Sequence, residues 1–305
     1  MTAPAYEVVK SGFVALIGRP NAGKSTLVNA LVGAKVAIVS NTPQTTRHRL
    51  RAIVDQEDAQ IVFVDTPGIH KPEDTLGEEL NRASIKALSD VDVACLVIDA
   101  SQQIGPGDRW VAHRVAEARA AHVLILTKAD IAKPSEVEKQ LAVAGGLMKF
   151  DDVVVCSARE GFNLDGVIET VKRHLPDGPR YFPRDMPTDQ PIEVMLAEFI
   201  RERILHNTRD EVPHAIGVSI EDMTREKNSD TTTIMALIYV ERESQKGIIV
   251  GKGGDMVRKI GTDARVDLER LLGTKVYLDL RVKLKKDWRR DASQIKRFGY
   301  GEGLQ

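Results

Sequence analysis

A glycine-rich segment near the N-terminus carries residue types that bind a phosphate chain. Gly18–Ser25 reads GRPNAGKS and fits the pattern G-x-x-x-x-G-K-[ST], directly after the apolar run FVALI and directly before TLVNALVG. Such glycines let backbone N–H groups face a phosphate, and the following helix start adds the positive end of its dipole. Lys24 is expected to reach the β- and γ-phosphates, and the Ser25 hydroxyl is expected to bind Mg²⁺. The nucleotide-contacting residues predicted here are Gly18, Arg19, Pro20, Asn21, Ala22, Gly23, Lys24, Ser25 and Thr26.

Two later segments offer groups for the metal and the γ-phosphate. The tetrapeptide DTPG, which starts at Asp65, follows the apolar run AQIVFV, so its carboxylate is expected at the edge of a sheet, near the magnesium shell. Gly68 offers a backbone N–H to the γ-phosphate. In the polar segment SNTPQTTRHRL, Thr46, with Thr45 as the alternative, can supply a second hydroxyl to Mg²⁺; a plain connecting loop is the competing interpretation. The predicted metal ligands are Ser25, Thr46 and Asp65, and the nucleotide site also takes in Thr66, Pro67, Gly68 and Ile69.

The tetrapeptide TKAD, residues 127–130, provides a way to select the base. It follows the apolar run AHVLIL, and the Asp130 carboxylate can accept hydrogen bonds from guanine N1–H and the 2-amino group. Adenine offers no such pair of donors and would leave a buried Asp130 unpaired, at a cost of roughly 1–3 kcal/mol. A helix N-cap is the competing interpretation of TKAD. The predicted guanine-binding residues are Thr127, Lys128 and Asp130, with Ser157 and Ala158 after the next apolar run.

Alternating apolar runs and helical patterns must position these groups. Between residues 12 and 175 the runs FVALIG, AQIVFVD, VDVACLVIDA, AHVLILT and DVVVCSA are separated by segments such as KSTLVNALVG. Continuous apolar strands between amphipathic helices predict an α/β domain with a mostly parallel sheet covered on both faces. With 305 residues, the chain is long enough for a second domain.

The second half has a different pattern and a different charge. Five prolines in residues 176–191 predict a linker without ladder or helix continuity. Beyond it the order is helix, strand, strand, helix, helix, strand, and the first helix, residues 192–206, places its apolar residues on one face. Residues 242–300 hold 16 Lys and Arg against 8 Asp and Glu, a local charge of +8 in a chain whose net charge is −1. This end is suited to a polyanion.

A glycine turn lies in this basic region. Gly251–Gly254 reads GKGG between IIV and DMVRKIG, and its glycines allow a nucleic-acid backbone to approach closely. In the α-β-β-α-α-β order the segment resembles a KH domain of the prokaryotic type, a module that binds single-stranded RNA. The competing interpretation is a helix-breaking turn in a solvated basic domain, with no ligand. The predicted RNA-binding residues are Gly251, Lys252, Gly253, Gly254, Arg258 and Lys259, and the tail KLKKDWRRDASQIKRFGYG can add electrostatic affinity.

The ordered set GRPNAGKS, PQTTR, DTPG, TKAD and CSA resembles the translation-factor-related GTPases and, with the C-terminal half, the bacterial Era family. The resemblance implies a P-loop GTPase domain (1–175), a Pro-rich linker (176–191) and an α+β type II KH domain with a basic tail (192–305). It also implies GTP or GDP and Mg²⁺ as ligands. The implied partners are the 3′ end of 16S ribosomal RNA and the 30S subunit during assembly, with no DNA.

Location is an expectation of the same kind. No apolar run approaches the roughly 20 residues of a membrane span, and the N-terminus lacks a signal-peptide pattern, so a cytoplasmic protein is expected. Resemblance to Era adds peripheral attachment to the cytoplasmic face of the cell membrane.

Two departures from the family pattern affect the site. Thr127 stands where the guanine motif usually begins with Asn, which shortens a side chain that braces the base pocket. Ile69 stands where a water-orienting Gln is common, so unassisted turnover is expected to be slow, on the order of 10⁻⁴ to 10⁻² s⁻¹. The residues predicted to act in hydrolysis are Lys24, Thr46, Gly68 and Asn21, with Asn21 resembling an asparagine that holds K⁺ in some relatives.

These features predict a switch in which GTP orders residues 40–49 and 68–75 and hydrolysis releases the RNA. The alternative is a non-catalytic RNA-binding assembly factor that uses the nucleotide as a structural ligand, which Ile69 favours. A P-loop kinase or ATPase is disfavoured by TKAD.

Overall fold

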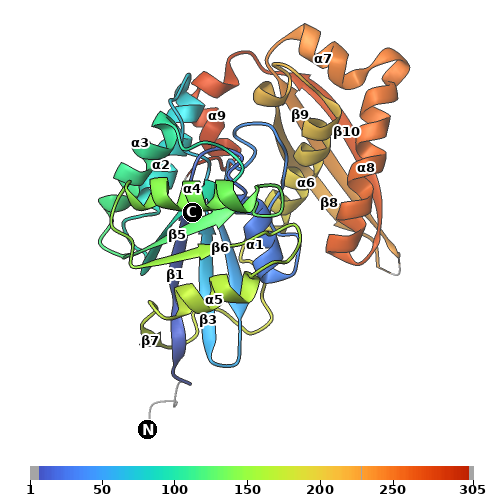
Figure 1. Ribbon diagram of the computed structural model, residues 1–305. Coiled ribbons are helices and arrows are strands. Elements are labelled where there is room, and N and C mark those ends of the chain that lie inside the picture. The colour runs from blue at the N-terminus through green and yellow to red at the C-terminus, as the bar shows by residue number, and fades with distance from the viewer. Residues whose placement is uncertain (1–6, 228, 302–305) are drawn as a thin grey trace.

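The computed structural model describes residues 7–227 and 229–301 as two packed halves, each with its own sheet (Figure 1). The outermost parts of the predicted domains, residues 1–6 and 302–305, lie outside the described residues, as does residue 228. Within the described part, no helix is long and apolar enough to cross a membrane.

The N-terminal half is built on a seven-stranded sheet of order β2-β3-β1-β4-β5-β6, with β7 paired to β1. The pairs β1–β3, β1–β4, β4–β5 and β5–β6 are parallel, whereas β2–β3 and β1–β7 are antiparallel. Strands β3 and β4 are buried along their whole length, which explains why their sequences are mostly apolar. The strands are β1 Val9–Ile17, β2 Leu50–Asp55, β3 Ala59–Asp65, β4 Val93–Asp99, β5 Ala121–Thr127, β6 Asp152–Val155 and β7 Asp177–Gly178.

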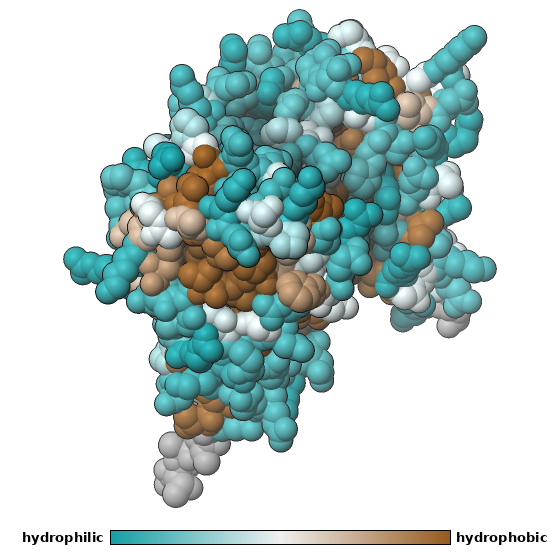
Figure 2. Space-filling model, viewed as in Figure 1, coloured by the Kyte–Doolittle hydropathy of each residue, from teal (hydrophilic) through white to brown (hydrophobic). Residues whose placement is uncertain are grey.

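Helices cover both faces of this sheet, as the sequence predicts. On one face Leu27 of α1 and Val167 of α5 belong to the same core cluster, and on the other Val111 of α3 and Ala144 of α4 belong to a second. These helices are α1 Lys24–Val32, α2 Thr75–Lys86, α3 Pro106–Ala116, α4 Pro134–Gly145 and α5 Leu164–Lys172. Figure 2 shows a mostly hydrophilic surface with an apolar area near α4 and β6, elements on which Val143 and Val153 are exposed.

The C-terminal half has the predicted order α, β, β, α, α, β around a three-stranded sheet β10-β9-β8. Strand β9 is parallel to β10 and antiparallel to β8. The elements are α6 Ile192–Asn207, β8 Gly217–Arg225, β9 Thr231–Val240, α7 Glu243–Val250, α8 Asp255–Leu272 and β10 Lys275–Leu284, with short 3-10 turns at Pro213–Ala215, Lys252–Gly254 and Trp288–Arg290 and a last helix α9 Ala292–Arg297.

The proline-rich segment 176–191 lies against the first sheet. Asp177–Gly178 pairs with β1, although the prolines predicted no ladder bonds there. Farther along, the backbone N–H groups of Tyr181 and Phe182 donate to the side-chain oxygen of Gln60 on β3 at 2.7 and 2.9 Å. The buried Gln60 side chain therefore accepts the backbone hydrogen bonds that a neighbouring strand would otherwise accept.

The predicted face of α6 is buried, and so is part of its other face. Met195, Phe199 and Ile200 pack in the core of the C-terminal half, while Arg201 and Glu202 are also buried. The charged face is buried because it lies against residues 35–49 of the N-terminal half, a contact that no periodicity in the sequence reports.

The basic tail is folded rather than simply solvated. Trp288, Ile295, Phe298 and Tyr300 form a buried cluster with Leu76 and Leu80 of α2 and with Tyr239 of β9. Arg289 adds ion pairs to Asp74 at the start of α2 and to Glu241 after β9. The aromatic residues between the cations thus join the two halves.

Replacement of Trp288 tests this joint. Its ring is fully buried against Phe298, and its Nε1 donates to the Ala215 carbonyl at 3.0 Å. Trp288→Ala is expected to lower the free energy of unfolding by about 3–5 kcal/mol, the usual cost of truncating a buried aromatic residue. The control is Trp110→Ala, at a site 41% exposed, which should cost less than about 1 kcal/mol. Equal losses for the two variants in urea denaturation would contradict the packing described here.

Candidate functional site

The glycine-rich loop joins β1 to α1 and surrounds the Lys24 side chain. Gly23, just before the helix, has φ of 92°, a left-handed conformation that favours glycine. The Lys24 Nζ donates to the carbonyls of Gly18 and Arg19 at 3.1 and 3.0 Å. Burial lowers the pKa of Lys24 to about 8, and the nearby Asp65 carboxylate opposes this shift. The loop therefore holds a buried cation at the position where phosphates are expected.

The three predicted magnesium ligands lie within hydrogen-bond distance of one another. The Ser25 Oγ is 2.8 Å from the Thr46 Oγ1 and donates to the Asp65 Oδ2 at 2.7 Å. The other Asp65 carboxylate oxygen is buried without a hydrogen-bond partner among the described residues. Burial raises the pKa of Asp65, whereas Lys24 and Ser25 act to lower it. Two hydroxyls and a carboxylate with a free oxygen fit a hard divalent cation such as Mg²⁺.

The geometry also distinguishes the two threonines. The Thr45 Oγ1 is turned into its own loop, where it contacts the Ser40 Oγ at 2.7 Å and donates to the Thr42 carbonyl at 2.5 Å. Thr46 alone of the pair reaches Ser25. Thr45 therefore stabilises the loop, and Thr46 faces Ser25 at the position expected for the metal.

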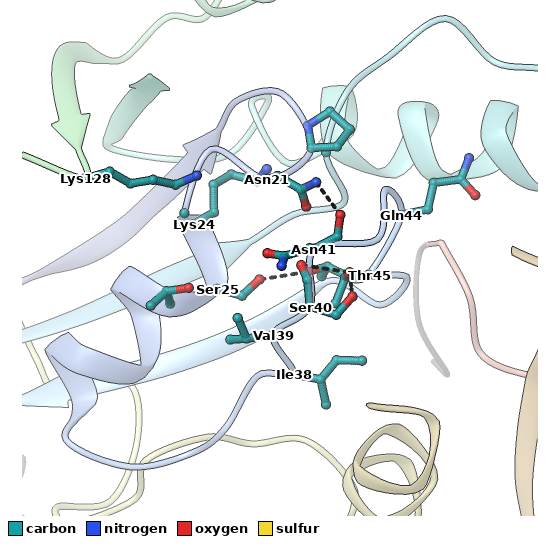
Figure 3. Close-up of a pocket in the computed structure, with 15 residues that line it drawn as sticks. Asn21, Lys24, Ser25, Ile38, Val39, Ser40, Asn41, Gln44, Thr45 and Lys128 are labelled. Carbon is teal, nitrogen blue, oxygen red and sulfur yellow. Dashed lines mark hydrogen bonds between the residues drawn. The ribbon is translucent and has the colours of Figure 1, made fainter. Parts of the chain in front are cut away.

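Residues 38–46 fold over the phosphate loop and close a cavity between the two segments (Figure 3). Lys24, Ser25 and Lys128 line one side, and the Asn21 Nδ2 donates across the opening to the Asn41 carbonyl at 2.7 Å. The loop that the sequence predicts to sense the γ-phosphate thus lies directly over the phosphate-binding residues.

The DTPG segment meets the same loop from the other side. At Gly68 a Cβ atom would come within 2.6 Å of the Pro20 backbone, so only glycine permits this approach. The Ile69 backbone N–H donates to the Gly18 carbonyl at 3.2 Å, while its side chain is buried in the core beside α3. Ile69 therefore serves packing, and its side chain does not line the cavity.

The base-side residues meet at the ends of β5 and β6. The Thr127 Oγ1 donates to the Ala22 carbonyl at 2.6 Å, so the hydroxyl that replaces the usual Asn amide still ties this segment to the phosphate loop. Lys128 forms an ion pair with Asp99 at 2.7 Å. Asp130 accepts a hydrogen bond from the Ser157 Oγ at 2.7 Å, which orients its carboxylate.

The second predicted site, the glycine turn, lies between α7 and α8 at the outer edge of the C-terminal half (Figure 1). Gly251, Gly253 and Gly254 have φ of 73°, 62° and 85°, and a Cβ at Gly251 would lie 2.7 Å from Met256. Lys252 and Lys259 are exposed, whereas the Arg258 guanidinium pairs with Asp255 at 3.0 Å. The turn thus offers open backbone and two exposed ammonium groups. It is separate from the phosphate-binding cavity, so the structure does not bring the two predicted sites together.

Residues that connect the two halves of the protein were not among the predicted site residues. Arg47 is buried, and its guanidinium donates to the carbonyls of His214 and Ile216 and lies over the ring of Tyr300. Burial, together with the neighbouring Arg201, lowers the pKa of Arg47 to about 10. An arginine directly after the two threonines was a visible signal, but its partners are more than 160 residues away.

Comparison with known proteins places this geometry in a family. A family model described as "50S ribosome-binding GTPase" matches residues 13–128, and a KH domain model matches residues 211–289. The structure of a single-residue variant of Aquifex aeolicus Era bound to GDP·AlF₄⁻ is 37% identical, with 96% of this chain and 100% of that chain covered and a TM-score of 0.92. Era in complex with MgGDPNP and nucleotides 1506–1542 of 16S ribosomal RNA is also 37% identical, with 96% and 99% covered and a TM-score of 0.93. The chain belongs to the Era family, and it is a GTPase with a C-terminal KH domain.

Proposed function

We propose that the protein binds Mg²⁺ and GTP, hydrolyses GTP slowly, and uses its KH domain to bind the 3′ end of 16S ribosomal RNA during assembly of the 30S subunit. The observation that supports this most strongly is the contact of Thr46 with Ser25, which itself bonds Asp65, because Thr46 belongs to a loop that packs on the KH half. One loop therefore contacts the phosphate site and the RNA-binding domain. The RNA itself is assigned by analogy with the related Era complex.

In the nucleotide site, the phosphates lie against the backbone of Gly18–Thr26, with Lys24 between the β- and γ-phosphates. Ser25, Thr46 and Asp65 would hold Mg²⁺, which would neutralise charge on the phosphates. Thr66–Ile69 close the site from the second side, with Gly68 N–H at the γ-phosphate. Asp130 accepts from the guanine, Thr127 and Lys128 brace its plane, and Ser157 and Ala158 complete the pocket. The Asp130–Ser157 hydrogen bond supports this assignment because it fixes the acceptor.

Hydrolysis then depends on positioning rather than on a strong base. Lys24 places the phosphate chain, the Thr46 hydroxyl holds the loop closed over it, and the Gly68 N–H orients the γ-phosphate. The buried side chain of Ile69 supplies no water-orienting group, which is consistent with slow unassisted turnover.

Asn21 is proposed as a K⁺ ligand, because its Nδ2 donates to the Asn41 carbonyl and thereby fixes the side-chain oxygen at the mouth of the cavity. Equal rates in K⁺ and Na⁺ buffers would disprove that role.

At the RNA site, Gly251–Gly254 allow close approach of the backbone, and Lys252 and Lys259 contact phosphates. Arg258 is placed with them, although it also forms an ion pair with Asp255.

For the domain boundaries we propose a GTPase domain at 1–175, a linker at 176–191 and a KH domain with its basic tail at 192–305. A cytoplasmic location with peripheral attachment to the cell membrane is a further proposal, and failure to sediment with anionic lipid vesicles would count against the attachment.

The central test is phosphate release from GTP and from ATP, with and without an RNA that carries the 3′ end of 16S ribosomal RNA. We expect slow turnover of GTP and none of ATP. The RNA should accelerate the turnover of GTP. Lys252→Ala/Lys259→Ala should weaken RNA binding and the acceleration about tenfold or more, since each phosphate contact contributes electrostatic affinity. Lys139→Ala/Lys149→Ala removes two exposed lysines from the GTPase half and is the control of equal charge. GTP binding without turnover would instead support a non-catalytic assembly factor.

Base selection has its own test. Asp130→Asn replaces an acceptor of two guanine N–H groups with an amide and should weaken GDP binding by about tenfold to a hundredfold. Xanthosine diphosphate presents a carbonyl where guanine has its amino group, so the variant should bind it better than GDP. Calorimetric titration with the two diphosphates measures both effects. Unchanged GDP affinity would show that Asp130 does not contact the base.

A further inference from the structure

Helix α6 of the KH half reaches into the GTPase site through one side chain. Arg201 is fully buried, and its guanidinium donates a hydrogen bond to the Thr45 carbonyl. That carbonyl belongs to the peptide bond between Thr45 and Thr46. Because a peptide unit is planar, holding the carbonyl also fixes the backbone N and Cα of Thr46.

The Arg201 side chain is itself held rigidly. Its Nε and one terminal nitrogen bond the two carboxylate oxygens of Glu198 at 2.8 and 2.6 Å, a bidentate arrangement within α6. The Glu198 Oε1 also lies 3.5 Å from the His48 Nε2. The charge of Arg201 and its hydrogen bonds hold the pKa of Glu198 far below its usual range despite its burial. Desolvation makes such a buried pair a poor source of stability. We therefore assign the pair a role in the geometry of the loop rather than in stability.

The residues around Thr46 are tied to the same half of the protein. On its far side Arg47 donates to the carbonyls of His214 and Ile216. Ahead of the loop, Ile38 packs in the KH core and the Val39 N–H donates to Glu202 at 2.9 Å. The loop is therefore held near both of its ends by residues outside the GTPase domain.

We propose that Arg201 is a positioning residue for GTP hydrolysis, acting through the Thr45–Thr46 peptide to hold the Thr46 hydroxyl at the metal position. The inference rests on the proposed function and adds to it that the KH half completes the GTPase site. The contact of Arg201 with the Thr45 carbonyl matters only when Thr46 binds the metal, as it would with GTP and Mg²⁺. Binding of GDP through Lys24 and Asp130 does not require it.

The test compares Arg201→Met with Arg203→Met in the full-length protein. Arg203 lies on the same helix, but its hydrogen bonds go to Asp267 of the KH half rather than to residues 40–49. Arg201→Met should lower single-turnover GTP hydrolysis about ten- to a hundredfold, the range for loss of one charge-assisted hydrogen bond. It should raise the Mg²⁺ concentration needed for half-maximal turnover and leave GDP affinity within about twofold. Arg203→Met should leave all three within about twofold.

Arg201→Lys provides the variant that keeps the charge beside Glu198 if the methionine variant does not fold. A lysine can still reach one acceptor, so its turnover should lie between those of Arg201→Met and the unchanged protein. Turnover and Mg²⁺ dependence at the unchanged level in either folded variant would overturn the proposal. Parallel losses of GDP affinity and turnover would also overturn it, since they indicate a structural role. If the unchanged protein failed to hydrolyse GTP, the proposed function itself would fall.

Discussion

The contact between the hydroxyls of Thr46 and Ser25 is the interaction on which the arrangement of the molecule depends. It closes residues 38–46 over the phosphate loop and places Asp65 beside both hydroxyls. The loop that carries Thr46 is then forced against α6, which explains why a helix with one apolar face in its sequence buries charged residues on the other. In this structure one loop therefore both closes the nucleotide site and contacts the KH half.

The charged groups buried between the two halves carry a desolvation cost. Arg47 and Arg201 are both buried, and two nitrogens of each donate to oxygen acceptors: carbonyls for Arg47, and Glu198 with the Thr45 carbonyl for Arg201. The Arg47 Nε and one terminal nitrogen of Arg201 have no partner among the described residues. A buried charge is tolerated only where such partners are present. Movement of the loop would expose several of these groups together, so the closed arrangement is expected to form and break as a unit rather than residue by residue.

The folded tail makes a second connection. Its aromatic cluster joins β9 of the KH sheet to α2, the helix that follows the DTPG segment. Both loops that surround the expected γ-phosphate position are thus in contact with the C-terminal half, one through α6 and one through Trp288 and its neighbours. By contrast, the glycine turn between α7 and α8 remains open, with Lys252 and Lys259 exposed. The KH half therefore contacts both loops, while the cavity at the phosphate loop is lined by residues of the N-terminal half.

The features that could be predicted from the sequence are those whose chemistry is local. Short sequence patterns are enough for these features, because glycine conformation and apolar periodicity are set by neighbouring residues. They include the phosphate loop, the apolar strands of the first domain, the α-β-β-α-α-β order and the resemblance to Era. Other features are visible only in the folded protein. They are the pairing of β7 with β1, the contact of Thr46 with Ser25, the hydrogen bond of Thr127 to the Ala22 carbonyl, and the contacts of Arg47 and Arg201. These contacts join residues up to about 170 positions apart, and the side chains involved give no periodic signal from which their partners could be inferred.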